Sequence, residues 1–148
     1  EKKHELLLPF IPDTEKQKAF KASIGYHTVF RNAPAVVLVY AGAYPVPSDD
    51  MVAGPGLTQE EIDHMRQTKP GIQNVAAAMQ NLHLAAATLG YGTCWMTGPT
   101  YAGTEISRMI GFEKEGYVLA ALTPLGIPAS GGTSPARKPV PEVLTVVD

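Results

Sequence analysis

A long alanine-rich segment, residues 72–89, constrains the fold more than any other feature of this sequence. It follows Pro70-Gly71 and contains neither glycine nor proline, and its larger apolar side chains recur with a helical period. We therefore predict one long helix here, which Gly90 can end in the left-handed conformation. Because alanines also occupy the face opposite those apolar side chains, we expect the helix to be buried and closely packed.

Apolar segments predict the strands of one sheet. Residues 33–41 form a continuous β-branched and apolar segment, typical of a strand covered on both faces, and residues 117–125 form a second. Residues 93–96 predict a short strand, and residues 143–147 predict a last strand near the C-terminus. This order of elements predicts an α+β fold, a three-layer α/β sandwich in which helices flank a mostly buried, mixed sheet.

The N-terminal segment contains a proline-rich part and a helix. Residues 6–12 carry two prolines in an apolar run, which predicts an extended or turn-like conformation rather than a helix. Asp13 or Thr14 can cap a helix that runs to about Ser23, and Gly25 is expected to end it.

Two further short helices and a loop follow from local signals. Residues 58–67 begin with the Thr-x-x-Glu spacing of a capping box, which predicts a short helix. Residues 102–110 predict another, capped by Thr104 and closed by Gly111. Residues 42–56 are rich in proline, glycine and aspartate and are interpreted as a loop.

The composition excludes several classes of protein. There are 12 basic and 14 acidic side chains and no run of either sign, so we expect no nucleic-acid partner. The apolar segments are too short to cross a bilayer and residues 1–5 begin no signal peptide, which indicates a cytoplasmic protein without a membrane partner. With Cys94 as the single cysteine and four scattered histidines, we expect neither a disulfide nor a metal site. The 148 residues predict one domain over 1–148.

Residues 74–98 resemble the central helix, turn and strand of the nitroreductase superfamily. They contain Ala78-Met79-Gln80-Asn81-Leu82 and then Leu89-Gly90-Tyr91-Gly92-Thr93-Cys94-Trp95, and Ala33-Pro34 opens a strand as it does in the family. Short downstream motifs agree in order: Met109-Ile110-Gly111-Phe112, Glu115-Gly116-Tyr117, Leu125-Gly126-Ile127-Pro128 and Arg137-Lys138-Pro139. The resemblance covers about residues 27–148, the C-terminal two-thirds of the family fold. The arginine-rich Arg-Ser-x-Arg opening of the family and its Asn-x-Gln-Pro-Trp strand do not occur in these 148 residues.

This resemblance implies an FMN-dependent oxidoreductase that takes electrons from NAD(P)H and passes them to a nitroaromatic, quinone or similar acceptor. It implies cofactor binding by Met96, Thr97 and Gly98, with the Thr97 and Gly98 amides meeting flavin N5 and O4, and by Arg137 and Lys138 at the phosphate. It also implies a homodimer in which the C-terminal strand extends over the partner. Because the flavin carries the chemistry, no side chain is assigned a catalytic role.

Each of these assignments has a plainer alternative. Gly98-Pro99 could be a simple turn, and Arg137-Lys138 could be a solvated basic pair. Cys94 is expected to be packed in a buried strand rather than to act as a nucleophile, and His83 to be a hydrogen-bonded interior or interface histidine. The alternative function is a non-enzymatic flavin- or ligand-binding protein, or a remnant dimeric scaffold that has lost full cofactor binding. A third alternative stays enzymatic, with reductive dehalogenation or flavin fragmentation as the reaction.

Overall fold

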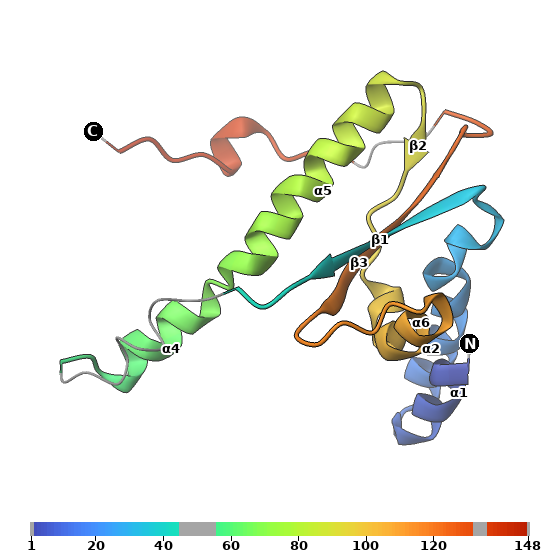
Figure 1. The fold of residues 1–148 in the computed structure, drawn as a ribbon, viewed down its shortest axis with the longest axis horizontal. Coiled ribbons are helices and arrows are strands. Elements are labelled where there is room, and N and C mark those ends of the chain that lie inside the picture. Colours follow the sequence, from blue (N-terminus) through green and yellow to red (C-terminus); the bar gives the residue numbers. More distant parts are fainter. Residues whose placement is uncertain (1, 45–55, 132–135, 148) are drawn as a thin grey trace.

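The computed structural model describes residues 2–44, 56–131 and 136–147. Its fold is α+β, as predicted, with a small sheet and helices packed against it (Figure 1). The helices and strands, in chain order, are α1 (Lys2–Leu7), η1 (Leu8–Phe10), α2 (Thr14–His27), η2 (Val29–Asn32), β1 (Ala35–Ala41), α4 (Gln59–Gln67), α5 (Pro70–Thr88), β2 (Gly92–Thr93), η3 (Gly98–Ala102), α6 (Gly103–Ile110), β3 (Val118–Gly126) and η4 (Val140–Glu142), where η marks a 3-10 helix.

The sheet has three strands in the order β1-β3-β2. β1 pairs with β3 from Ala35 opposite Leu125 to Ala41 opposite Val118, and β2 pairs with the end of β3. All these pairings are antiparallel, so within the described residues the prediction of a mixed sheet is wrong. β3 is the central strand, and its side chains Leu122 and Thr123 are among the most buried of the described residues.

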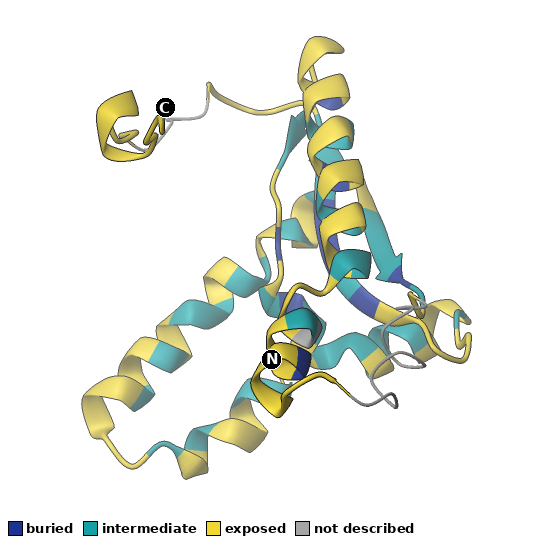
Figure 2. Cartoon of the chain, turned by 90° about the vertical axis from the view of Figure 1, so that its left-hand side faces the viewer, coloured by how far each residue is buried: buried dark blue, intermediate teal, exposed yellow. Residues whose placement is uncertain are grey.

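Helix α5 crosses the sheet and contacts all three strands (Figure 1). Only Met79 and Ala86 of this helix are buried, and its outer side is exposed along most of its length (Figure 2). Leu84 is 57% exposed and Leu89 is 72% exposed. The prediction of a buried helix is therefore wrong for the single chain, because a three-stranded sheet covers only one stripe of the helix.

The first residues are helical, which corrects the prediction of an extended segment. α1 ends at Leu7, and Pro9 lies in the first turn of η1, where a missing backbone N–H leaves no hydrogen bond unmade. Asp13 caps α2 as predicted, because its carboxylate accepts from the Glu15 and Lys16 amides at 2.8 and 3.0 Å. α2 then continues past the predicted end to His27, since glycine weakens a helix interior without breaking it.

The remaining local signals are largely confirmed. The capping box forms: the Thr58 hydroxyl accepts from the Glu61 amide at 3.3 Å, and the Glu61 carboxylate accepts from the Thr58 amide at 2.7 Å. Gly90 and Gly111 end their helices with φ of 80° and 69°. Thr104 does not cap α6, which begins at Gly103 without a side-chain cap. The predicted strand at 93–96 is shorter than expected and is represented by β2 and an isolated bridge from Met96 to Leu122.

The predicted C-terminal strand does not form in the single chain. After η4, residues 143–147 are irregular and exposed, and this segment projects from the body of the molecule (Figure 1). A strand needs a neighbouring sheet edge to satisfy its backbone groups, and in the described part of the chain residues 143–147 pair with no strand. Most of the predicted loop at 42–56 lies outside the described residues.

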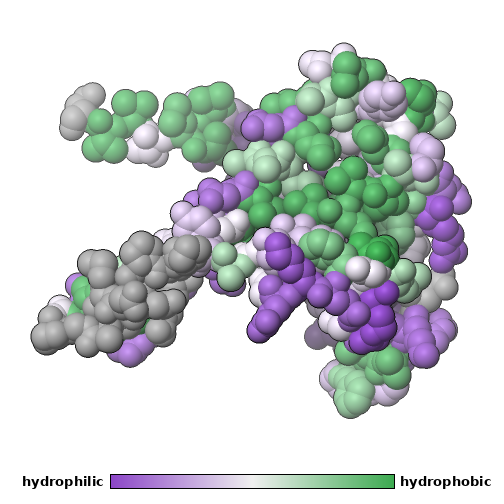
Figure 3. All heavy atoms as spheres, in the orientation of Figure 1, coloured by the Kyte–Doolittle hydropathy of each residue, from purple (hydrophilic) through white to green (hydrophobic). Residues whose placement is uncertain are grey.

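Apolar surface remains exposed in two places. Hydrophobic side chains gather over the centre of the face seen in Figure 3 and along the projecting C-terminal segment. The exposed side chains of that segment include Val140, Val143, Leu144, Val146 and Val147. In the part of the chain that the structure describes, no helix is long and apolar enough to span a bilayer.

Candidate functional site

The chain leaves the sheet at a turn that has unused hydrogen-bond donors. Met96 is buried, and its amide and carbonyl both bond to Leu122 at 2.9 Å. The next two residues are different: among the described residues, the Thr97 and Gly98 amides donate to no acceptor. Two adjacent N–H groups therefore stay available to a bound molecule, as a flavin ring edge would require.

A largely apolar cavity of about 460 Å³ lies beside this turn. It is enclosed by α1, the end of α2, η3 and α6. Its polar side chains include Lys2 and Lys3 from α1 and Glu105 from α6. Its volume is within the range of about 300–1,000 Å³ that is usual for small-molecule sites. An apolar interior with a few charged groups suits a planar aromatic ring that carries an anionic tail.

The imidazole of His27 lies directly against Gly98. A β-carbon placed on Gly98 would be 2.5 Å from His27 Cδ2 and 2.9 Å from Nε2, which is too close for any real side chain. The ring is held from its other edge, because His27 Nδ1 is 3.0 Å from His4 Nε2. His4 in turn stacks on Phe20, with ring centroids 4.7 Å apart. Position 98 must therefore be glycine, because the His27 imidazole lies where a side chain would begin.

Charge in the cavity is partly paired. Lys3 Nζ lies 3.0 Å from a Glu105 carboxylate oxygen, and both side chains are close to half exposed. This hydrogen bond from Lys3 is the main cause that lowers the pKa of Glu105, and a backbone amide adds to it. Burial, and next the neighbouring His27, lower the pKa of His4. The described residues contain no cluster of three His, Cys, Asp or Glu side chains that could bind a metal.

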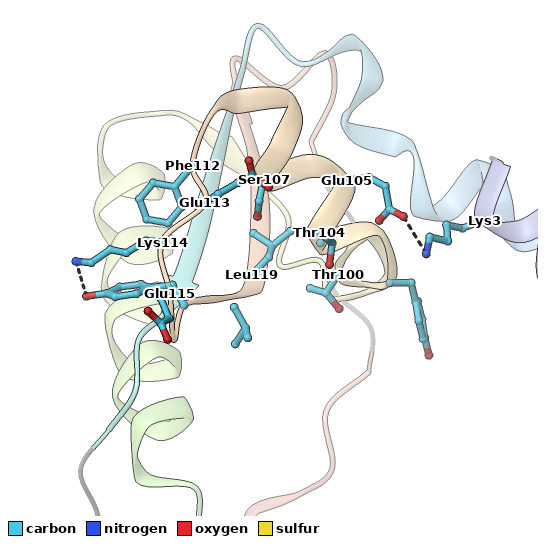
Figure 4. A pocket seen from close by; sticks show the side chains of 14 residues that line it. Lys3, Thr100, Thr104, Glu105, Ser107, Phe112, Glu113, Lys114, Glu115 and Leu119 are labelled. Carbon is cyan, nitrogen blue, oxygen red and sulfur yellow. Dashed lines mark hydrogen bonds and ion pairs between the residues drawn. The ribbon is translucent and has the colours of Figure 1, made fainter.

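A second cavity of about 560 Å³ lies on α6 and the start of β3 (Figure 4). It shares Lys3, Tyr101 and Glu105 with the first cavity but is more open and more polar. Lys114 lies over the Tyr117 ring at 4.2 Å from its centroid and donates to the Tyr117 hydroxyl at 3.1 Å. The first cavity is the better candidate, because it combines apolar walls with the free amides at Gly98.

The predicted site residues do not all converge. Gly98 lines the first cavity, Thr97 precedes it as the N-cap of η3, and Met96 is packed in the core. Arg137 and Lys138 are exposed on the C-terminal segment, which leaves the body on the side away from η3 and α6 (Figure 1). Within one chain the structure therefore does not bring these two cations to Gly98.

The cavity also contains residues that the sequence did not single out. His27 and His4 are far from Gly98 in sequence, and neither belongs to a recognisable motif. A contact made only by tertiary packing leaves no periodic or spacing signal in the sequence. The available indication in the sequence is Gly98, which is followed by Pro99. A glycine there indicates that another group packs closely against the backbone, but it does not identify that group.

Two predictions about the neighbouring segment are corrected. Cys94 is exposed rather than buried, because only its backbone is anchored, with the amide donating to Thr123 Oγ1 at 3.1 Å. His83 packs edge-on against Trp95, with ring centroids 5.7 Å apart. Its Nε2 is buried and has no hydrogen-bond partner among the described residues, so the expected hydrogen-bonded histidine is not found there. Burial lowers the pKa of His83.

Because the pKa values of His4 and His83 are lowered, we expect the folded protein to be less stable in weak acid. The folded state disfavours the charged forms of His4 and His83, so below their ordinary pKa of 6.5 the unfolded chain takes up protons more readily. The free energy of unfolding is therefore expected to fall as the pH decreases from 7.5 to 5.5. Urea unfolding at several pH values measures this, and His4→Gln and His83→Gln should each make the decline shallower. An unchanged slope in both variants would contradict the assignment.

Comparison with known proteins agrees with the fold. The model of the Nitroreductase family matches residues 2–127. A Cr(VI) reductase from Pseudomonas sp. (strain G-1) is 34% identical over 74 residues, which are 50% of this chain and 30% of that protein. The matched part thus spans less than a third of that relative. The family and this relative support an oxidoreductase role.

Solved structures lead to the same family. The crystal structure of a BluB-like flavoprotein from Clostridium difficile 630 matches with a TM-score of 0.85 and 33% identity, covering 99% of this chain and 70% of that one. A nitroreductase-like family protein from Bacillus cereus matches with a TM-score of 0.54 and 21% identity, covering 97% of this chain and 65% of that one, and shows the fold alone. With a family match over most of its length and this shared α+β fold, the chain belongs to the nitroreductase family.

Proposed function

We propose that this chain forms part of an FMN-dependent oxidoreductase that takes electrons from NAD(P)H and passes them to a nitroaromatic, quinone or similar acceptor. The observation that carries the proposal is the pair of unbonded amides at Thr97 and Gly98 beside an apolar cavity. The similar BluB-like structure is that of a flavoprotein, which supports a flavin here. Bound FMN would supply two-electron transfer, and the chain would supply its position and surroundings.

The residues at the cavity fit the chemical parts of FMN. The Thr97 and Gly98 amides would hold the polar edge of the ring, and the apolar walls would exclude water from it. Lys2 provides positive charge for a phosphate, whereas Lys3 is already paired with Glu105. Arg137 and Lys138 would add to this charge where the C-terminal segment of a second copy reaches the cavity.

A homodimer in the cytoplasm is part of this proposal, and the exposed apolar surfaces support the dimer. The outer side of α5 and the C-terminal segment are both apolar and uncovered in the single chain. Val146 and Val147 are 79% and 87% exposed, and adjacent exposed apolar side chains of this kind often mark an interaction surface. In a dimer, residues 143–147 would gain a sheet edge on the partner, and the segment would carry Arg137 and Lys138 with it.

An absorbance spectrum of the purified protein tests the cofactor. We expect flavin bands after incubation with FMN, and bleaching of these bands when NADH or NADPH is added without oxygen. Arg137→Gln should weaken FMN binding by about tenfold, the loss of one charge-assisted hydrogen bond. Lys69→Gln, at the start of α5 and outside the cavity, removes a charge without this effect. A protein that takes up no FMN would overturn the proposal.

A second function, a non-enzymatic scaffold, has one specific observation in its favour. The His27 ring already packs against Gly98, and neither Arg137 nor Lys138 lines the cavity in the single chain. In that case the protein would be colourless with added FMN and would still associate through α5. The same spectrum, combined with the molar mass from light scattering, separates the two functions.

A further inference from the structure

The His27 ring packs directly against Gly98, whose amide we propose as a cofactor contact. The ring lies within van der Waals contact of the Gly98 backbone, and it lines the cavity that we propose for the cofactor and acceptor. The resemblance to the family assigned His27 no role. Imidazole commonly exchanges protons near neutral pH, so His27 is placed to give a proton to a molecule bound in this cavity.

The surroundings fix which edge of His27 faces the site. Nδ1 is engaged by His4 Nε2 at 3.0 Å, which leaves Nε2 as the edge beside Gly98. When His4 donates its proton to Nδ1, the neutral His27 carries its own proton on Nε2. A protonated His27 also carries one there, and its Nδ1–H then donates to a neutral His4. These two states present an N–H group at the cavity; the opposite neutral arrangement, in which His27 Nδ1 donates to His4, does not.

His4 is itself held in place, so its contact with His27 is a defined one. Its ring stacks on Phe20, and the preceding residue, Lys3, pairs with Glu105 at 3.0 Å. The ionisable groups around His27 are Lys2, Lys3 and His4 on α1, Tyr26 beside it on α2, Tyr101 on η3 and Glu105 on α6. Glu105 is paired with Lys3, so no free carboxylate in this set competes for the His27 proton.

We infer that His27 is the proton donor of the site and that His4 is the residue that positions it. The inference rests on the proposed function and specifies it for acceptors such as quinones. Bound FMN in its reduced form would supply a quinone with a hydride equivalent, two electrons and one proton, and would itself be oxidised; the quinone oxygen on which negative charge develops needs one further proton. Protonated His27 gives its Nε2 proton to the acceptor oxygen, which completes the hydroquinone. The neutral imidazole then regains a proton from solvent.

The pH dependence of turnover tests this assignment in the FMN-loaded protein with menadione as acceptor. His27→Gln keeps a polar side chain but cannot give up a proton, so we expect kcat to fall at least 100-fold, the usual range for loss of a general acid. The decline of kcat toward high pH should disappear in this variant, while the Kd for FMN changes less than threefold. His4→Gln should lower kcat by a smaller factor and shift the pH at which it declines. His64→Gln, on α4 and outside the cavity, is the matched control.

A measurement independent of turnover completes the test. Long-range proton–nitrogen NMR of the histidine rings should show His27 protonated at Nε2, a mixture of tautomers in His4→Gln, and a menadione-induced shift of His27 but not of His64. If wild-type protein binds FMN and reduces menadione but His27→Gln retains kcat and the pH profile, the role of His27 is overturned and the proposed function stands. If the wild-type protein binds no FMN, both are overturned.

Discussion

Replacement of Leu122 by alanine is expected to lower the free energy of unfolding by about 2–5 kcal/mol. Leu122 is only 1% exposed and lies at the middle of the central strand β3. Its backbone pairs with Met96, so its side chain sits where the sheet meets the turn that leads to Gly98. Alanine would leave a cavity that the paired strands on both sides cannot close.

Chemical denaturation with urea measures this loss, followed by circular dichroism. Ile127→Ala is the matched control, because Ile127 follows the same strand but is 75% exposed, and its truncation should change the free energy by less than about 0.5 kcal/mol. Equal losses in the two variants would mean that Leu122 is not a core residue. Loss of FMN uptake by Leu122→Ala at temperatures where the variant stays folded would show that the core supports the turn.

The elements that were predicted correctly are those whose signals are local. The capping box at Thr58 and the left-handed glycines at 90 and 111 depend on a few neighbouring residues, and the structure contains all three. The two long strands follow from continuous apolar runs, and they pair with each other along most of their length. In these cases the chemistry of a short segment decides its conformation.

The errors lie where conformation depends on what covers a segment. The periodicity of residues 72–89 predicts the helix correctly but not how much of it is buried, because burial depends on the size of the sheet. Residues 143–147 are rich in β-branched side chains, yet they pair with no strand among the described residues and stay irregular. An apolar segment thus tends to be buried, but the neighbouring elements determine whether it is buried in the single chain.

The candidate site divides in the same way. Thr97 and Gly98 were identified through their resemblance to the family; among the described residues their amides have no acceptor, and their contact with a flavin stays a prediction. His27 was not identified, because its contact with Gly98 joins the end of α2 to a turn far along the chain. The sequence indicates the glycine of this contact, whereas only the structure identifies the histidine.

Gly98→Ala tests that contact directly. We expect it to weaken FMN binding by at least tenfold and to lower the free energy of unfolding by about 1–3 kcal/mol, the usual cost of overpacking. The added methyl group would lie 2.5 Å from His27 Cδ2, so the imidazole must move and its 3.0 Å contact with His4 is disturbed. Fluorescence titration with FMN and urea unfolding measure the two effects. Gly25→Ala is the matched control, because a β-carbon at Gly25 in α2 meets nothing within 4 Å and should stabilise the helix by about 0.5–1 kcal/mol.

A double-mutant cycle identifies His27 as the cause. In a His27→Ala background the imidazole is absent, so Gly98→Ala should cost less than about 0.5 kcal/mol, and the coupling between the two positions should exceed about 1 kcal/mol. Equal costs in both backgrounds would show that the methyl group conflicts with another part of the turn. If stability recovers in the double variant while FMN binding stays weak, the methyl group itself blocks the ring edge, and the Gly98 amide is then the part of the site that the cofactor requires.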